Sequence, residues 1–297
     1  MTLELFAQLL VNSLAIGLLY VLIVLGMDII IRVCNIINFA HGHIYALSAF
    51  VFWFTFSSLG LHPILAIVLS LLLMALLGVV TYLGIFNTLQ SRFTPDVPMS
   101  HRFLLSAMLS LGLMMIIERG TLLAFGAEER GVPSIFPQMV TIANVSLPLE
   151  KLVIMLVCLV AMVGLFFLFF KTKIGRALRA VSSNVEASSL LGINTTRINL
   201  LGFTIGCVLA GLAGVLVAPV YAINTHMGML VIFLALVVMM LGGIGSYKGA
   251  LLGGIILGLT LSFGFQFIGG LCYLAIWGLF MVVLSFRPGG LLGEALD

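Results

Sequence analysis

The chain is dominated by apolar runs, and each run is about as long as a helix must be to cross a bilayer, which is about 20 residues. These runs cover residues 6–29, 39–59, 62–87, 102–125, 150–170, 198–218, 227–244, 249–268 and 270–286, the last two joined closely enough for a helical hairpin. They lack the alternation typical of membrane β-barrels. The sequence therefore predicts an all-α, polytopic membrane protein with about eight to ten transmembrane helices, including broken or re-entrant segments, in a single transmembrane domain over residues 1–297.

Composition points to lipid as the solvent of this chain. Of its 297 residues, 62% are hydrophobic and 8% are charged, whereas soluble domains carry about 25% charged residues. The four cysteines are scattered without a CxxC pair, which favours packing roles over a metal or redox site. Glu4 precedes the first apolar run without a basic cluster, so we expect a retained helix rather than a cleaved signal.

Basic residues predict the orientation of the chain. The longest polar stretch, residues 171–197, holds Lys171, Lys173, Arg176, Arg179 and Arg197 against the single acidic residue Glu186. Short loops rich in Lys and Arg stay in the cytoplasm. Counting helices from this loop brings Arg32, Arg92, Arg102, Lys248 and Arg287 to the same side and residues 126–149 to the outside. We expect a multi-pass protein of the bacterial inner (cytoplasmic) membrane, with a periplasmic amino terminus and a cytoplasmic carboxyl terminus.

A polar segment, residues 35–42, interrupts two of the apolar runs. Its two asparagines, Asn35 and Asn38, and its His41 and Gly42 lie within eight residues. Unsatisfied polar groups each cost several kcal/mol in hydrocarbon. The segment is therefore either a helix break that faces a protein-lined or wet cavity, or a cytoplasmic turn.

A second interruption lies in the cytoplasmic loop 171–197. Residues 186–194 predict one or two helical turns that end at Gly192. Leu190, Leu191 and Ile193 form the apolar face of these turns. Such a face either docks in the groove of another protein or rests on lipid headgroups.

Small residues recur every four positions in two other segments, as Gly202, Gly206, Ala210 and Gly214, and as Gly245, Gly249 and Gly253. This spacing lets membrane helices approach closely. The run from Gly242 to Ser246 is too rich in glycine for a helix interior and predicts a break or hinge.

Charged pairs near the ends of two runs are interpreted as structural. Asp28 and Arg32 are spaced for an i, i+4 pair, and Glu118 and Arg119 lie toward the outer half of the fourth run. Intramembrane ionisable groups are candidates for function, but mutual pairing and snorkelling near helix ends account for these.

Motifs of known chemistry are absent from the sequence. It contains no GxxxxGK[ST], HExxH or GxSxG pattern, so it predicts no catalytic residue, and any ATP hydrolysis needs another chain. Two classes of membrane protein that the sequence leaves to be weighed are an ion-coupled transporter and a membrane-embedded enzyme that uses His41 or His43. The first requires an acidic or histidine relay near the bilayer centre, and the second has too few ligands for a metal.

Several blocks together resemble the branched-chain amino-acid ABC permeases of the LivH/LivM type, and the LivH-like branch in particular. These blocks are Ile37-Asn38-Phe39-Ala40-His41-Gly42, Gly175 to Val181, Ala187 to Asn194, Phe203 to Leu216, and Leu241 to Ser246. They occur in the family's order over almost the whole chain. The resemblance implies a transport subunit without an ATPase site of its own.

The resemblance also implies roles for individual residues. Candidates for the solute path or its gate are Asn38, Phe39, His41, Gly42, Gly242, Gly243, Gly245 and Ser246. Candidates for coupling to an ATPase are Arg176, Arg179, Glu186, Ala187, Leu190, Leu191, Gly192 and Ile193. The implied partners are a second permease (a LivM-like sister or a second copy), two ABC ATPases that bind ATP and Mg²⁺, a periplasmic solute-binding protein and the bilayer, with no nucleic acid. No cofactor is expected on this chain.

The implied solutes are leucine, isoleucine and valine. Relatives often carry a Lys in a G-x-K-x-F stretch, and residues 228–233 contain none. This departure keeps urea, short amides or another small solute as alternatives within the same class.

Overall fold

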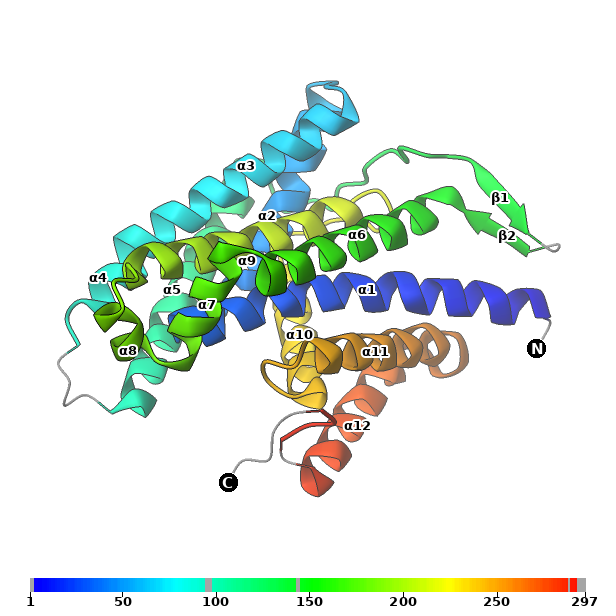
Figure 1. Ribbon diagram of the computed structural model, residues 1–297. Coiled ribbons are helices and arrows are strands. Elements are labelled where there is room, and N and C mark those ends of the chain that lie inside the picture. Colours follow the sequence, from blue (N-terminus) through cyan, green and yellow to red (C-terminus); the bar gives the residue numbers. More distant parts are fainter. Residues whose placement is uncertain (1–2, 94–97, 143–144, 288, 293–297) are drawn as a thin grey trace. The chain divides into compact units, whose positions relative to one another are not determined.

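The computed structural model describes residues 3–93, 98–142, 145–287 and 289–292, and its regular structure is almost entirely helical (Figure 1). The α-helices are α1 (Leu3–Cys34), α2 (His41–Trp53), α3 (Pro63–Thr81), α4 (Asn87–Gln90), α5 (Met99–Phe125), α6 (Leu149–Lys171), α7 (Lys173–Ser183), α8 (Val185–Leu190), α9 (Thr195–Val217), α10 (Met227–Gly242), α11 (Tyr247–Ile268) and α12 (Cys272–Phe286). Phe54–Ser58 and Tyr82–Phe86 are π-helical turns, and Gly269–Leu271 is a 3₁₀ turn.

The helices confirm a polytopic, all-α membrane protein. Among the described residues, 6 helical stretches are long and apolar enough to cross a membrane, and the last of them, Tyr247–Phe286, combines α11 and α12. Every apolar run found in the sequence falls on a helix. However, α2 and α10 have only 13 and 16 residues, so each is shorter than a full crossing.

The packing of the described residues divides the chain into two compact units. Unit 1 contains residues 1–25, 133–161 and 233–297, and unit 2 contains residues 26–132 and 162–232. Helices α1, α6 and α10 each contribute to both. That residues 1–297 act as a single domain remains a prediction.

In unit 2, α9 packs against α2 and α3 through its small residues. Gly206, Ala210 and Gly214 are all buried, as their spacing predicts. A Cβ at Gly214 would overlap the carbonyl oxygen of Tyr45 in α2, and one at Gly211 would lie 2.7 Å from Met74 in α3. Close packing at these small residues therefore holds the three helices together, with backbone against backbone between α9 and α2.

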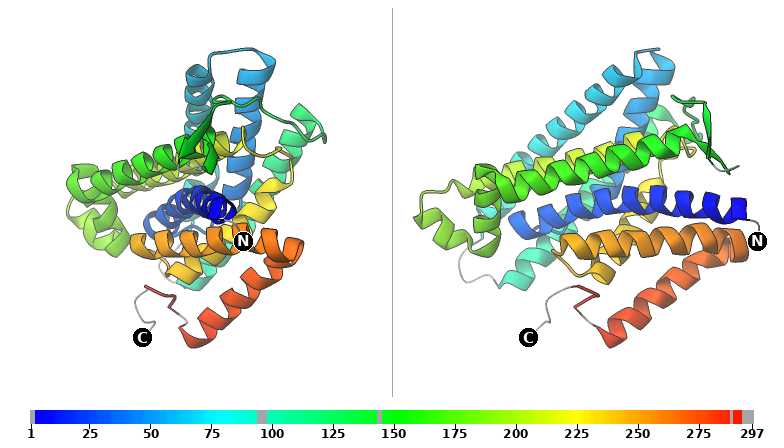
Figure 2. Two further views of the ribbon diagram at one scale, coloured as in Figure 1. Left: turned by 90° about the vertical axis from the view of Figure 1, so that its right-hand side faces the viewer. Right: turned by 45° about the vertical axis from the view of Figure 1, so that its right-hand side comes forward.

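In unit 1, the first part of α1 runs beside α11 (Figure 2). A Cβ at Gly17 would lie 2.7 Å from the carbonyl oxygen of Gly254, and one at Gly258 would overlap that of Ser13. Unit 1 also holds an antiparallel hairpin of β1 (Met139–Ile142) and β2 (Val145–Pro148), with Val140 opposite Leu147. From the sequence this stretch is expected only to be an outer loop, because four-residue strands are too short to show a period.

Candidate functional site

The polar segment before α2 lies against α5 within unit 2. The backbone N–H of Ile37 donates to the hydroxyl oxygen of Ser106 at 3.4 Å, and the N–H of Phe39 donates to that of Ser110 at 3.0 Å. Non-helical backbone at membrane depth is tolerated where protein groups satisfy it. Of the two interpretations of this segment, the helix break lined by protein is therefore the one that the contacts favour.

Local conformation explains where the break begins and ends. Asn35 has φ of 54°, a left-handed conformation that Asn tolerates better than most residues, and it ends α1. The side-chain Oδ1 of Asn38 then accepts the N–H of Ala40 at 3.1 Å, just before α2 starts. The two asparagines thus shape a chain reversal that apolar residues do not support.

The predicted path residues of this segment are largely buried. Asn38 is 1% exposed and His41 is 0% exposed, while Phe39 is partly exposed. His41 packs next to Gly26 of α1, since a Cβ at Gly26 would lie 3.2 Å from the imidazole. Gly42 instead touches the first turn of α10, where a Cβ would overlap the carbonyl oxygen of Gly228.

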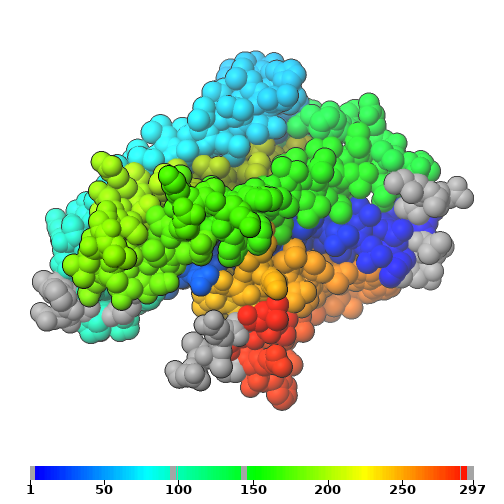
Figure 3. Space-filling model, in the orientation of Figure 1, coloured from blue at the N-terminus to red at the C-terminus, as the bar shows by residue number. Residues whose placement is uncertain are grey.

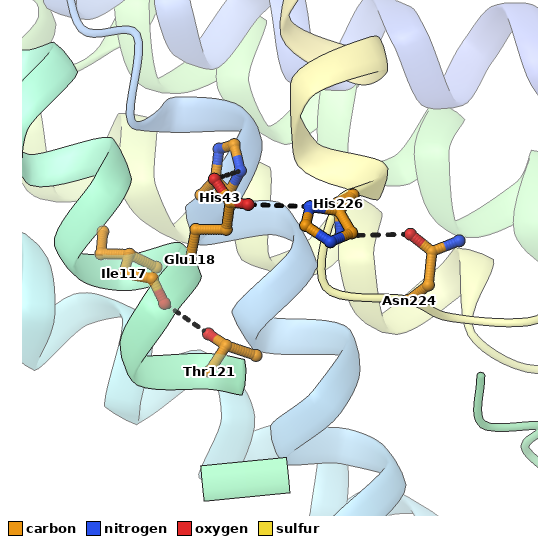
Figure 4. A network of polar contacts seen from close by, with 6 residues as sticks. All are labelled: His43, Ile117, Glu118, Thr121, Asn224 and His226. Carbon is orange, nitrogen blue, oxygen red and sulfur yellow. Dashed lines mark hydrogen bonds and ion pairs between the residues drawn. The ribbon is translucent and has the colours of Figure 1, made fainter. Parts of the chain in front are cut away.

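A polar network beside the break involves residues outside the predicted set (Figure 4). The Glu118 carboxylate of α5 lies 2.8 Å from Nδ1 of His226 and 3.5 Å from Nε2 of His43. The His43 side chain is 1% exposed, that of Glu118 is 16% exposed and that of His226 is 67% exposed. Glu118 therefore contacts two histidines from different segments, whereas its sequence neighbour Arg119 is exposed on another side of α5.

The carboxylate of Glu118 lies near the amino termini of two helices, because its contacts are with His43 and His226. His43 is in the first turn of α2, and His226 directly precedes α10. A helix amino terminus carries a partial positive charge that stabilises a nearby anion within about one turn. In the part of the chain that the structure describes, no group of three His, Cys, Asp or Glu residues is placed to hold a metal ion.

One sequence signal could have identified this network. Ser106, Ser110 and Glu118 are spaced by four and eight residues, so they share one face of an apolar helix. All three contact the break or the first turn of α2. The pairing with His226 has no such signal, because it joins segments more than 100 residues apart.

The predicted glycine-rich break after α10 is present in unit 1. Gly243 and Gly245 have φ of 96° and 83°, which end α10, and the Ser246 hydroxyl accepts the N–H of Gly249 at 3.0 Å to begin α11. The N–H groups of Leu291 and Leu292 donate to the carbonyl oxygens of Leu241 and Gly242 at 2.8 and 3.2 Å. The chain after α12 therefore closes the end of α10.

The predicted cytoplasmic loop contains the two short helices α7 and α8. Asn184 caps α8 by accepting the N–H of Ala187 at 2.8 Å. Gly192, with φ of 81°, ends the turn as predicted, and the backbone N–H of Ile193 donates to the carbonyl oxygen of Ser188 at 3.1 Å. Figure 3 shows α8 at the surface of the molecule.

The side chains of this loop differ in how accessible they are. Leu190 and Leu191 are 88% and 80% exposed, and Ile193 is partly exposed. Arg179 bonds back to the carbonyl oxygen of Phe169 at the end of α6, whereas Arg176 is exposed. The two leucines therefore present the main apolar surface of this loop, and Glu186 and Ala187 lie exposed one turn before them.

A cavity of about 640 Å³ connects the break to this loop within unit 2. Its walls include Asn35 and Ile36 at the end of α1, Arg102 of α5 and Glu186 of α8. This volume is in the range of small-molecule sites, about 300–1,000 Å³. Residues predicted for coupling and residues next to those predicted for the path thus line one space.

Comparison with known proteins gives matches over nearly the whole chain. Residues 9–285 match a family model described as branched-chain amino acid transport system / permease component. The chain is 30% identical over 296 residues to the high-affinity branched-chain amino acid transport system permease protein BraD of Pseudomonas aeruginosa, covering 97% of this chain and 96% of the relative. It is 29% identical to LivH of Salmonella typhimurium and 28% identical to LivH of Escherichia coli, each with the same coverage. No solved structure matches the chain significantly.

Proposed function

The chain belongs to the family of branched-chain amino acid transport permeases, and from this we propose that it is the permease subunit of an ABC importer that translocates leucine, isoleucine and valine. The observation that carries the proposal is the family match over residues 9–285. A multi-pass protein of the inner membrane fits this role, and so do its apolar helices, 6 stretches of which can cross a membrane by length and composition.

We further propose that the transporter contains three other kinds of component. Two ABC ATPases bind ATP and Mg²⁺ and hydrolyse the nucleotide, a second permease (a LivM-like sister or a second copy of this chain) completes the path, and a periplasmic binding protein delivers the solute. The absence of a P-loop motif from the sequence supports a separate ATPase. The chain itself then needs no cofactor.

Coupling to the ATPase is assigned to α7 and α8. The exposed Leu190 and Leu191 form a compact apolar surface of the kind that enters a groove on a partner. Glu186 of α8 and Asn35 beside the break line the same cavity, so movement of α8 changes the surroundings of the break. Coupling requires that these contacts differ between two states of the transporter.

The orientation follows from the basic residues. With residues 171–197 in the cytoplasm, the amino terminus lies in the periplasm and the carboxyl terminus in the cytoplasm. Single cysteines at Leu59 and Lys173 test this by labelling with a membrane-impermeant reagent in intact cells. Labelling at residue 59 alone supports the orientation, and labelling at residue 173 alone overturns it.

The first experiment is affinity purification of the tagged permease from mild detergent, followed by mass spectrometry. A P-loop ATPase and a second permease are the expected companions, and the associated binding protein is then screened for its solute. Purification of the chain alone in several detergents, together with solute uptake into liposomes driven by an ion gradient, would replace the ABC assignment by secondary transport. A binding protein selective for urea or amides would correct the solute.

A further inference from the structure

Glu118 is a charged group that the proposed coupling does not use. It lies on the protein-facing side of α5, and its side chain is only 16% exposed. An ionisable residue in a membrane helix is costly, so it is retained where it pairs or has a function. Its neighbours decide between these two roles.

Neither histidine beside Glu118 has the geometry of a permanent counter-ion. Nε2 of His43 is 3.5 Å from the carboxylate, beyond a good hydrogen bond, and among the described residues neither ring nitrogen of His43 has a hydrogen-bond partner. His226 makes the short contact of 2.8 Å, but its side chain is 67% exposed. His43 is thus buried but too far from the carboxylate for a good hydrogen bond, whereas His226 is close to the carboxylate but accessible.

The His226 side chain can leave without a change in the backbone around it. The backbone N–H of His226 donates to the side-chain Oδ1 of Asn224 at 3.2 Å. The neighbouring Ile223 exchanges both backbone hydrogen bonds with Arg130 at 2.9 Å. Rotation about the side-chain bonds of His226 is therefore sufficient to expose one carboxylate oxygen of Glu118.

A carboxylate has about four acceptor positions, and an ammonium group brings three donors and a positive charge. We propose that Glu118 binds the ammonium group of a zwitterionic amino acid in the translocation path, that this group displaces the imidazole of His226, and that His43 positions the carboxylate from its buried side. The inference rests on the proposed function in amino-acid import. It also gives a basis for solute choice, because urea and short amides have no cationic group to pair with Glu118.

The test uses the complete transporter in proteoliposomes, with its ATPases, second permease and binding protein, and measures uptake of radiolabelled leucine. Glu118→Gln keeps the size and an acceptor for His226 but removes the charge. Because the charge-assisted hydrogen bond to the ammonium group is lost, uptake is expected to fall at least about tenfold. The unfolding temperature of the purified complex should not change, and Glu118→Asp should restore part of the uptake.

Two further variants separate binding from packing. Glu128→Gln removes another carboxylate of unit 2, one that is 79% exposed and pairs with Arg130 at 3.1 Å, and it should transport like the wild type. His226→Gln removes the group that is displaced, so it should import leucine at least as well as the wild type. A loss in His226→Gln as large as that in Glu118→Gln contradicts displacement.

The remaining outcomes are equally decisive. If Glu118→Gln takes up leucine as fast as the wild type, the inference is overturned. It is also overturned if Glu118→Gln and Glu118→Asp both lose uptake and both show the same fall in unfolding temperature. If the wild type imports none of leucine, isoleucine and valine, the proposed function fails instead, and the variants are repeated with the solute that the binding protein carries. A neutral solute then overturns the role of Glu118, whereas a solute with an ammonium group that depends on Glu118 supports it.

Discussion

Gly42 and Gly228 lie in direct backbone contact, so that the first turns of α2 and α10 meet with no side chain between them. A Cβ at Gly228 would lie 2.7 Å from the carbonyl oxygen of Gly42, and a Cβ at Gly42 would overlap the carbonyl oxygen of Gly228. Glycine is the one residue that permits this approach. The contact also brings His43, next to Gly42, and His226, two residues before Gly228, to the same carboxylate.

Gly42→Ala is expected to destabilise the protein. The added methyl group meets backbone, which cannot move aside as a side chain can, and overpacking of this kind costs about 1–3 kcal/mol. The measurement is the unfolding temperature of the detergent-purified protein. Gly112→Ala is the matched control in α5, because nothing among the described residues lies within 4 Å of its Cβ. Equal unfolding temperatures for the two variants would refute the contact.

Ser110→Ala should weaken the break before α2. The substitution removes the acceptor for the N–H of Phe39, and an unsatisfied buried donor costs about 1–3 kcal/mol. Hydrogen exchange at residues 37–40, followed by mass spectrometry, should become faster. Ser285→Ala serves as control, since the Ser285 hydroxyl is exposed and bonds only within its own helix. Unchanged exchange in Ser110→Ala would show that Ser110 does not hold the break.

Two substitutions of Asn35 are expected to have different effects. Its φ of 54° is accessible to glycine, but costs about 1–2 kcal/mol for other residues with a Cβ. Asn35→Gly should therefore unfold close to the wild-type temperature, and Asn35→Val should unfold clearly below it. The reverse order would mean that Asn35 is not left-handed in the folded protein.

Replacement of Leu190 and Leu191 together by serine should impair binding of the ATPase. Both side chains are largely exposed, so the fold should tolerate the change, whereas the loss of apolar residues central to an interface lowers affinity by at least about tenfold. The amount of ATPase that co-purifies is the measurement. Leu59→Ser changes an exposed leucine directly after the π-helical turn Phe54–Ser58 and should keep the ATPase. Full retention of the ATPase by the double variant would remove α8 from the coupling assignment.

The apolar runs were sufficient to predict the helices, because hydropathy over about 20 residues depends on no other part of the chain. The same holds for the break at Gly242–Ser246, because a glycine-rich stretch is unfavourable inside a helix. For residues 35–42, the sequence left a helix break and a cytoplasmic turn both open. Gly192 could likewise be predicted as a helix end. Each of these features is determined by residues close together in the sequence.

The choice between His41 and His43 could not be made from the sequence. The two residues are two positions apart on α2, so they point in directions about 200° apart around the helix. The family motif includes His41, which packs beside Gly26, whereas His43 faces Glu118. Only the position of α2 relative to α5 decides which imidazole meets the carboxylate. The sequence also predicted that Glu118 pairs with its neighbour Arg119. Adjacent residues on a helix face different sides, and Glu118 contacts the histidines instead.

The backbone bonds that residues 291 and 292 make with the end of α10 bear on how the protein is made. While these residues are still inside the ribosome, the carbonyl oxygens of Leu241 and Gly242 lack the partners that they have in the finished protein. Chains fold from the amino terminus during synthesis, so this part of unit 1 is completed only after translation has passed residue 292. The helix whose first turn lies beside Glu118 is thus the one whose last turn must wait until residues 291 and 292 have been made.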